Sequence, residues 1–197
     1  MDRAGGPDHE LLSRLRKRDP ELLASLVREH SRPLYRAARA LGFSEPDAED
    51  LVQEVFVTFL SSLDRFEGRS QLRTWLFGIL HKKAMERRRA QAREGRHDPI
   101  DEVFEARFDA QGNWSAPPRD LGRLAEARQL LDAIQHCLER LPPSQRAVFV
   151  LREMEGFETK EICKITGVTV TNLGVLIFRA RNRLRECLEE RGWGKRK

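Results

Sequence analysis

The chain has 197 residues, of which 40% are hydrophobic and 34% charged, and its formal net charge is +5 at pH 7. This composition is ordinary for a helix-rich globular protein, and no apolar run approaches the roughly 18 residues that a membrane span needs. The first residues hold no apolar stretch like that of a signal peptide, so we expect a cytoplasmic protein.

Helix signals dominate the N-terminal part, and no stretch alternates apolar and polar residues for long enough to indicate a sheet. The pair Asp19 and Pro20 indicates the start of a helix. Ser44 and Asp47 have the spacing of a capping box, and apolar residues recur at helical intervals after them. We expect these helices, over residues of about 8–91, to bury one core.

One face of the helix that follows Ser44 is acidic and polar. Its outward residues are Asp47, Asp50, Gln53, Glu54 and Thr58. Acidic residues in a first turn also complement the helix dipole, so this pattern has a purely structural explanation too. An acidic face does not suit DNA, and a binding partner there would have to be a protein.

A polar loop with one aromatic residue, residues 61–71, precedes a helix that begins after Ser70 and becomes densely basic. Single-stranded DNA is held by stacking and hydrogen bonds to unstacked bases and by cations on its phosphates. The loop alone fits two interpretations equally well. It either captures bases, or Phe66 packs on Trp75 beside a solvated basic helix end.

Charge changes sign abruptly after residue 96. Residues 82–96 hold seven Lys or Arg and two acids, whereas residues 97–118 hold five acids and one Arg. Because glycine and proline are frequent there and apolar periodicity fades, residues 92–124 are predicted to form a flexible acidic linker. Trp114 within it is interpreted as a partly packed aromatic residue rather than a docking anchor.

From about residue 125 the helical patterns resume. Two of them, about 159–165 and about 169–188, are joined by a turn at Gly167, with Thr169 as the predicted cap. Two helices joined by a few residues that include glycine are typical of a helix-turn-helix. The sequence therefore predicts an all-α protein of two small helical domains joined by a flexible acidic linker, the second containing a helix-turn-helix.

The second helix of this pair has a distinctive outward face. With Ala180 at the centre of the buried face and a step of about 100° per residue, the residues that point outward are Thr171, Val175, Phe178 and Asn182. Those that border them are Arg179, Arg181 and Arg185. Such a face suits a duplex major groove, and a merely solvated face would gain nothing from an exposed phenylalanine.

Three segments occur along the chain in this order: "DAEDLVQEVFVTFL", "FEGRSQLRTWL", and "GFETKEI" followed by "FRARNRL". Together they resemble the extracytoplasmic-function (group IV) sigma factors, the promoter-recognising subunits of bacterial RNA polymerase, over roughly residues 15–190. The resemblance implies a domain at 1–91 that binds core polymerase and opens the −10 element. It also implies a linker at 92–124 and a domain at 125–197 that reads the −35 element.

The resemblance also assigns roles to matching residues. Those that match the segment docking on the polymerase β′ clamp helices are Asp47, Asp50, Leu51, Gln53, Glu54 and Phe56. Those that match the −10 surface are Phe66, Glu67, Gly68, Arg69, Ser70, Arg73, Thr74, Trp75, Lys82, Lys83 and Arg87. Those that match the −35 reader, on a recognition helix of about 169–188, are Thr169, Thr171, Asn172, Gly174, Val175, Phe178, Arg179, Arg181 and Asn182.

The partners that the resemblance implies are core RNA polymerase, through the β′ clamp helices and the β-flap, promoter DNA, and an anti-sigma protein. No cofactor and no small-molecule substrate is implied. The chain departs from many members at Lys82 and Glu86, where they carry asparagine and aspartate. It also departs at Gly174 and Val175, where they carry longer polar side chains, so −35 readout is expected to use apolar contacts and DNA shape.

The residues alone leave two other classes of function open. A helix-turn-helix regulator that acts without docking on polymerase is the nearer alternative, although the N-terminal features are not explained by it. An enzyme is the other, but the histidines form no metal-binding or triad pattern and no glycine-rich phosphate loop is present. The three cysteines, Cys137, Cys163 and Cys187, match no metal or disulfide framework and are expected to be buried structural thiols.

Overall fold

The computed structural model describes residues 7–93 and 124–193, and over these residues every regular element is helical. The predicted all-α class is therefore confirmed. The N-terminal lobe consists of α1 (Pro7–Arg16), α2 (Pro20–Ala40), α3 (Glu45–Ser61), the short 3-10 helix η1 (Leu63–Arg65) and α4 (Leu72–Arg93). The C-terminal lobe consists of α5 (Leu124–Glu139), α6 (Pro143–Phe149), the π-helical turn η2 (Val150–Met154), α7 (Thr159–Thr166) and α8 (Val170–Glu190). The predicted linker at 92–124, with Trp114, lies almost entirely outside the described residues.

Side-chain caps fix the helix starts of the N-terminal lobe. The Asp19 carboxylate accepts hydrogen bonds from the amides of Glu21 and Leu22 at 3.0 and 3.3 Å, and Pro20 occupies the first turn of α2. The Ser44 hydroxyl likewise accepts from the Asp47 amide at 3.3 Å, at the start of α3. Both predicted starts are confirmed, and the fully buried Leu34, Leu51, Val55, Phe59 and Phe77 form the core between α2, α3 and α4.

The C-terminal lobe contains the predicted helix pair. Gly167 ends α7 with a φ of +76°, a backbone conformation that favours glycine, and the Thr169 hydroxyl accepts from the Asn172 amide at 3.3 Å to cap α8. The two helices meet at 95°, within the range of a helix-turn-helix. Of the described helices none alone has the length and apolar composition to cross a bilayer; α7 and α8 satisfy that test only when taken together.

A disulfide joins Cys137 of α5 to Cys187 of α8, with Cα atoms 5.7 Å apart. The expectation of unpaired thiols was therefore wrong for these two residues. The two residues are 50 positions apart in the sequence, and no sequence pattern predicts that α5 and α8 lie side by side. Cys163 is free and half-buried on α7.

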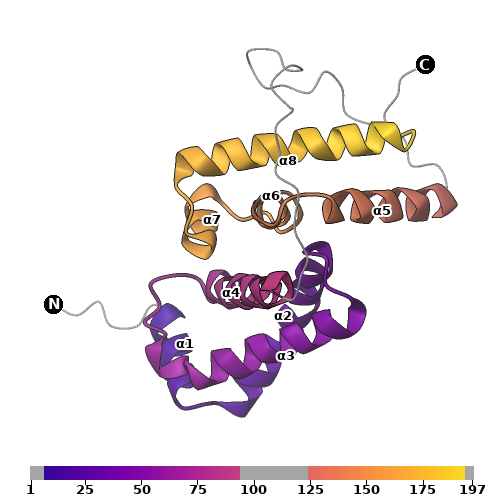
Figure 1. Cartoon of the computed structure of the whole chain (residues 1–197). Coiled ribbons are helices and arrows are strands. Elements are labelled where there is room, and N and C mark those ends of the chain that lie inside the picture. The colour runs from indigo at the N-terminus through magenta and orange to yellow at the C-terminus, as the bar shows by residue number, and fades with distance from the viewer. Residues whose placement is uncertain (1–6, 94–123, 194–197) are drawn as a thin grey trace.

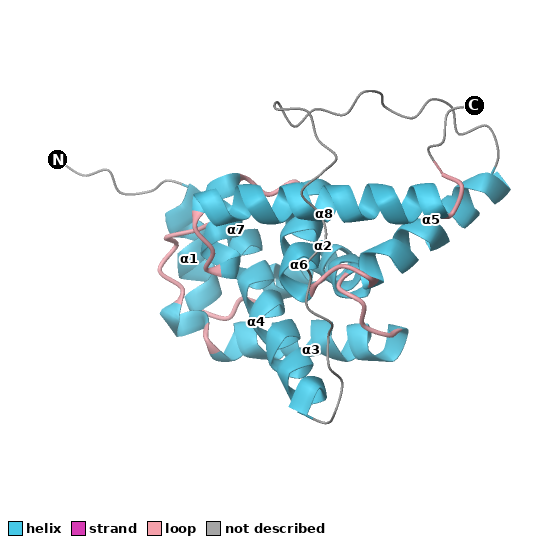
Figure 2. Cartoon of the chain, turned by 45° about the horizontal axis from the view of Figure 1, so that its top comes forward, coloured by secondary structure: helices cyan, strands magenta, loops and turns pink. Residues whose placement is uncertain are grey.

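The two lobes pack against each other, mainly through α4 and α7, with α2 also touching η2 and α5 (Figure 1). The rings of Phe77 and Phe157 meet edge to face across this boundary with centroids 4.9 Å apart, and both side chains are fully buried. Helix α8 lies on the side of the C-terminal lobe that faces away from the N-terminal lobe, as Figure 1 and the turned view of Figure 2 both show.

Candidate protein and nucleic-acid interfaces

The outer face of α8 is the first candidate interface. Leu173, Ala180, Leu184 and Cys187 are buried against the rest of the lobe, so the opposite side of the helix is left to solvent. The residues exposed on that side are Thr171, Asn172, Gly174, Val175, Phe178 and Arg179. Two of them are large apolar side chains, Val175 at 42% and Phe178 at 40% exposure. A face of hydroxyl, amide and apolar groups beside a guanidinium has the chemistry to contact base edges and thymine methyls.

Three predicted residues of α8 differ from the rest of that face. Asn182 is only 7% exposed, so its expected outward position was wrong. The helical projection assumed that α8 is buried along one side only. In the structure its neighbours Arg183, Arg185 and Glu186 are also half-buried, so a wider part of the helix surface is buried near Asn182. Arg181 forms an ion pair with Glu153 of η2 at 2.6 Å, and the Thr169 hydroxyl is used by its own helix cap.

The outward face of α3 is the second candidate interface. Asp47, Asp50 and Gln53 are exposed, as predicted, but Leu51 and Phe56 lie in the core of the lobe. Val57, which was not among the predicted residues of this face, is 66% exposed one turn after Gln53. Its signal was an apolar residue outside the buried stripe of its own helix. An acidic, polar face around one exposed valine suits a protein partner.

Glu54 of α3 is bound by two cations of α4. Its carboxylate lies 2.5 Å from a guanidinium nitrogen of Arg87 and 4.0 Å from the ammonium of Lys83. Arg87 also donates to the Asp47 carbonyl at 3.2 Å. Two members of the predicted basic track are thus turned toward α3, whereas Lys82 is exposed.

The loop before α4 holds its aromatic residue inside. Phe66 is buried and stacks on Trp75 with centroids 4.6 Å apart and planes 13° from parallel, and Trp75 meets Phe59 edge to face at 5.4 Å. Of the two interpretations of the loop, packing of Phe66 on Trp75 is the arrangement that the structure contains. Glu67 and Arg69 form an exposed ion pair at the tip of the loop.

Gly68, at the tip of the same loop, has a φ of +70°, and a Cβ atom placed there would lie 3.0 Å from Leu12 of α1. A left-handed backbone and close approach both favour glycine at this position. Ser70, the last residue of this loop that is predicted to belong to the −10 surface, is half-buried.

The start of α4 lies at the boundary between the lobes. Thr74 is only 4% exposed, and its hydroxyl donates to the Glu161 carboxylate of α7 at 2.7 Å. Arg73 donates to the Glu155 carbonyl at 2.7 Å and to its carboxylate at 3.0 Å. Glu155 and Glu161 carry no DNA role in the sequence analysis, because only the folded chain brings them to α4.

Burial and nearby polar groups shift the pKa values of these two carboxyls. Desolvation raises the pKa of Glu155, and the nearby Arg36 and Arg73 guanidiniums offset only part of that rise. Desolvation favours a higher pKa for Glu161, but the Thr74 hydroxyl and the Glu158 amide, which donate to its carboxylate, together with the charges of Arg73 and Lys164, outweigh it and lower that pKa overall. The pKa values of two carboxyls at the same boundary are therefore shifted in opposite directions.

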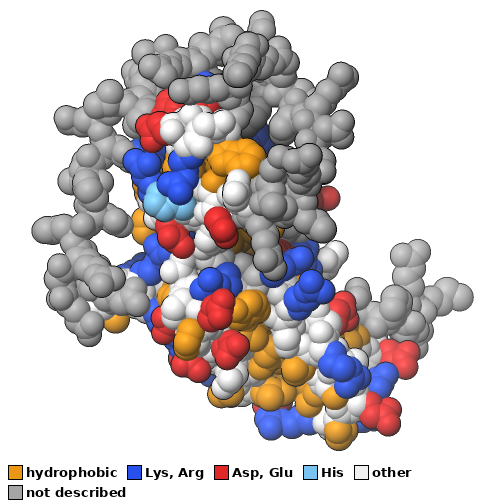
Figure 3. Space-filling view, turned by 90° about the vertical axis from the view of Figure 1, so that its right-hand side faces the viewer, with side chains coloured by type: hydrophobic (Ala, Val, Ile, Leu, Met, Phe, Trp, Pro, Cys, Tyr) orange, Lys and Arg blue, Asp and Glu red, His pale blue; other side chains and the backbone are white. Residues whose placement is uncertain are grey.

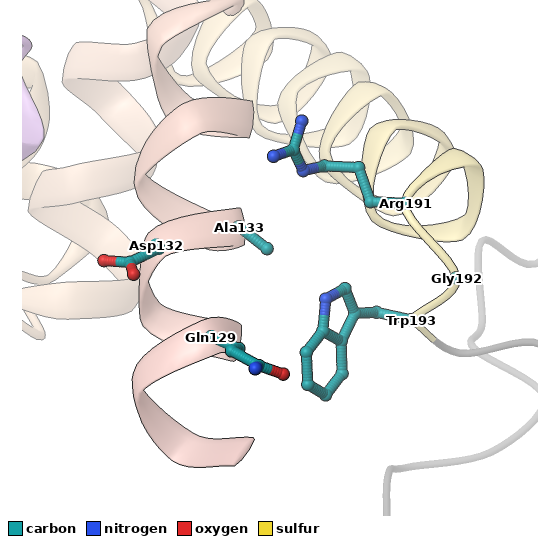
Figure 4. A pocket seen from close by; sticks show the side chains of 6 residues that line it. All are labelled: Gln129, Asp132, Ala133, Arg191, Gly192 and Trp193. Atoms are coloured by element: carbon teal, nitrogen blue, oxygen red, sulfur yellow. The ribbon is translucent and has the colours of Figure 1, made fainter. Parts of the chain in front are cut away.

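No other chemistry is assembled in the described part of the chain. Within those residues no three His, Cys, Asp or Glu side chains gather as metal ligands would. A polar hollow lies between α5 and the end of α8, lined by Gln129, Asp132, Ala133, Arg191, Gly192 and Trp193 (Figure 4). It is open and holds no nucleophile beside a base, so it offers no catalytic arrangement. On the side of the molecule in Figure 3, acidic and basic side chains are interspersed rather than separated.

Comparison with known proteins shows the family of the chain. Residues 26–94 match the family model of Sigma-70 region 2, and residues 131–184 match that of Sigma-70 region 4. The chain belongs to the extracytoplasmic-function group of the sigma-70 family. Helices α3 and α4 thus fall in region 2 of this sigma factor, and the helix pair α7 and α8 falls in region 4.

Curated relatives agree with this family over most of the chain. The ECF RNA polymerase sigma-E factor of Escherichia coli K12 is 30% identical, over 88% of this chain and 90% of its own length. The RNA polymerase sigma factor NccH of Alcaligenes xylosoxydans xylosoxydans is 31% identical, over 92% of this chain and 95% of its own. The similarity therefore includes both lobes.

Two solved structures share the fold. CnrH, solved in complex with the cytosolic domain of CnrY, is 26% identical with a TM-score of 0.67, covering 93% of this chain and 97% of that one. RpoE of Bartonella quintana, solved in complex with the anti-sigma factor NepR, is 27% identical with a TM-score of 0.64, covering 84% of this chain and 96% of that one.

Proposed function

We propose that this sigma factor binds core RNA polymerase through α3, directs it to promoters and contacts their −35 and −10 elements. One observation carries the proposal: a single chain contains both sigma regions and exposes an acidic, polar face on α3 and, on α8, a face of polar and apolar side chains with the chemistry to contact DNA bases. The protein acts by binding in the cytoplasm and not as an enzyme.

Each face has one partner under this proposal. Asp47, Asp50 and Gln53 meet the β′ clamp helices of polymerase, since an acidic face repels DNA but attracts a basic protein surface. The outer face of α8 enters the −35 major groove, where Val175 and Phe178 contact bases through apolar surface. The domains of the sequence analysis, 1–91 and 125–197, carry these two tasks, and the acidic linker at 92–124 joins them.

An anti-sigma protein is the proposed inhibitor of this factor. Exposed Val175 and Phe178 are apolar surface that such a protein can cover. Because the similar protein RpoE was solved with the anti-sigma factor NepR, a bound inhibitor is consistent with this fold. A pull-down from native cells should recover polymerase together with a small protein; polymerase alone would argue against the inhibitor.

Transcription in vitro tests the main proposal. Purified core polymerase, with and without the protein, is given a library of promoter fragments, and new start sites that share two spaced elements are expected only with the protein. Asp50→Arg should abolish core binding, because it reverses a charge at the centre of the α3 face. Asp64→Arg, an equal charge change at an exposed residue of η1, is the matched control. Failure to bind core, with footprints on duplex DNA alone, would instead favour a regulator that acts without polymerase.

A further inference from the structure

Exposed apolar side chains gather on the first turns of α8. Val170 is 62% exposed, and Val175 and Phe178 are exposed as well. Val170, Gly174 and Phe178 are spaced four residues apart, so they follow one row along the helix, and Val175 lies beside that row. We call Val170, Val175 and Phe178 the apolar stripe. At a rise of about 1.5 Å per residue the stripe is about 12 Å long, the length of roughly four stacked base pairs.

Groups that hydrogen-bond to bases are scarce beside the apolar stripe. Over the stretch of α8 that holds the stripe, only Thr171 and Asn172 carry polar side chains. Arg179 is exposed at the border of the stripe, a position suited to phosphates, and Arg181 is held by Glu153 of η2 at 2.6 Å. The commonest specific contact to DNA, arginine or lysine on guanine, therefore has no donor at the centre of this face.

The apolar group that an unmodified base presents in the major groove is the C5-methyl group of thymine. The first residues of a recognition helix are those that contact base edges, and the apolar stripe lies on the first turns of α8. No Asp or Glu occurs in residues 170–185, so this end of the helix does not repel phosphates. Position, charge and apolar chemistry thus fit thymine methyl groups better than the hydrogen-bonding edges of the bases.

We infer that this chain reads its −35 element through methyl groups, with Val170, Val175 and Phe178 each contacting the C5-methyl group of a pyrimidine. This inference rests on the proposed function, because it names the bases that α8 meets. 5-Methylcytosine presents its methyl group at the same place in the groove as thymine, so it replaces thymine where cytosine does not. Methylation of a cytosine within such an element therefore strengthens the promoter.

Selection from a duplex library is the first test. The library carries about twelve random base pairs, just over one turn of duplex, and is made once with thymine and once with uracil, which lacks only the methyl group. Full-length protein, alone and bound to core polymerase, retains duplexes that are then sequenced. Thymine should be enriched at neighbouring positions of the first library, and uracil should lose that enrichment in the second. Equal enrichment of thymine and uracil would overturn the inference.

Valine-to-threonine variants assign the preference to single side chains. Val170→Thr and Val175→Thr each replace a methyl group by a hydroxyl and keep the branched shape, so each should lose the thymine preference at one position. Both side chains are exposed, and the fold should not change. Val27→Thr, at an exposed valine of α2, is the matched control and should select the same duplexes as the unchanged protein. If neither α8 variant alters any thymine preference, the apolar stripe is not the reader and the inference is wrong.

Fluorescence anisotropy with the selected duplex is the second test, with thymine, uracil, cytosine or 5-methylcytosine placed at one enriched position at a time. Loss of one methyl contact should weaken binding about fourfold, as expected for one buried group of that size. 5-Methylcytosine should bind about as tightly as thymine, and cytosine about as weakly as uracil. In Val175→Thr the difference between thymine and uracil should vanish at one position. 5-Methylcytosine that binds no better than cytosine would show that the methyl group is not what is read.

Transcription with core polymerase separates this inference from the proposed function. If the protein alone selects duplexes that depend on thymine methyl groups but never binds core polymerase, the methyl readout stands and the proposed function fails. If the protein directs transcription from the selected elements but binds thymine and uracil duplexes equally, the proposed function stands and the methyl readout is wrong. Failure to enrich any sequence, alone or with core polymerase, would overturn both.

Discussion

Arg87 of α4 is bound to Glu54 of α3, with a guanidinium nitrogen 2.5 Å from the carboxylate. The sequence assigns the first residue to DNA and the second to polymerase, yet in the folded chain they are partners. Since Arg87 is only 25% exposed at its side chain and also donates to the Asp47 carbonyl, its position is set by α3. We therefore interpret it as a residue that orients the α3 face and not as a phosphate contact.

Arg87→Ala should weaken core-polymerase binding by about fivefold, or about 1 kcal/mol, because Glu54 loses its orienting partner. The salt dependence of single-stranded DNA binding by the polymerase holoenzyme should stay the same. Lys82→Ala, at an exposed residue of the same helix, should reduce the slope of log K against log salt by about 0.7, as expected for one lost phosphate contact. A reduced slope for Arg87→Ala would place Arg87 on DNA after all.

Local features of the fold could be predicted because they depend on neighbours in the chain. The caps at Asp19, Ser44 and Thr169 and the turn at Gly167 each involve residues within four positions of one another. The exposed side of α8 through Phe178 also followed from helical periodicity alone.

Contacts between distant segments could not be predicted in the same way. The Cys137–Cys187 disulfide, the burial of Asn182 and the pairing of Thr74 with Glu161 each depend on how helices pack. An apolar face predicted from the sequence indicates that a helix packs against another element, but not which element that is. For this reason the sequence could propose Arg73 and Thr74 for the −10 surface but could not show that Glu155 and Glu161 pair with them.

Trp75→Ala should lower the free energy of unfolding by about 2 kcal/mol, roughly half the cost of deleting a fully buried indole, because Trp75 is half-buried. Loss of the Trp75 ring also frees Phe66, so residues 63–71 should exchange amide hydrogens faster. Initiation should fall while core binding persists. Trp75→Phe keeps a ring under Phe66 and should recover most of the stability in urea denaturation. Equal losses of core binding and initiation in Trp75→Ala would indicate general unfolding instead.

Reduction of the disulfide should destabilise the C-terminal lobe. Cys137 and Cys187 close a loop with a sequence separation of 50, for which chain entropy gives a stabilisation of about 4 kcal/mol. Denaturant midpoints of the full chain should therefore fall on addition of reductant. The variant Cys137→Ser with Cys187→Ser should start at the lower value and be insensitive to reductant. An unchanged midpoint in reduced wild-type protein would contradict the prediction.

Substitution of Gly174 should affect the stability of the protein and its binding to DNA in opposite directions. It lies inside α8 on the exposed face, and a Cβ atom placed there meets nothing within 4 Å. Gly174→Ala should therefore raise the free energy of unfolding by about 1 kcal/mol, since glycine is a poor helix former. If the −35 duplex approaches this face as closely as proposed, the same methyl group should weaken binding to promoter duplex.

Gly78→Ala is the matched control, because Gly78 lies inside α4 and its Cβ position is equally open. It should raise stability by a similar amount and leave duplex binding unchanged, as measured by urea denaturation and by fluorescence anisotropy with −35 DNA. Stability and affinity should thus move in opposite directions for Gly174→Ala alone. If both alanine variants bind duplex equally well, the groove is not at Gly174, and the contact between α8 and the −35 element must lie elsewhere on the helix.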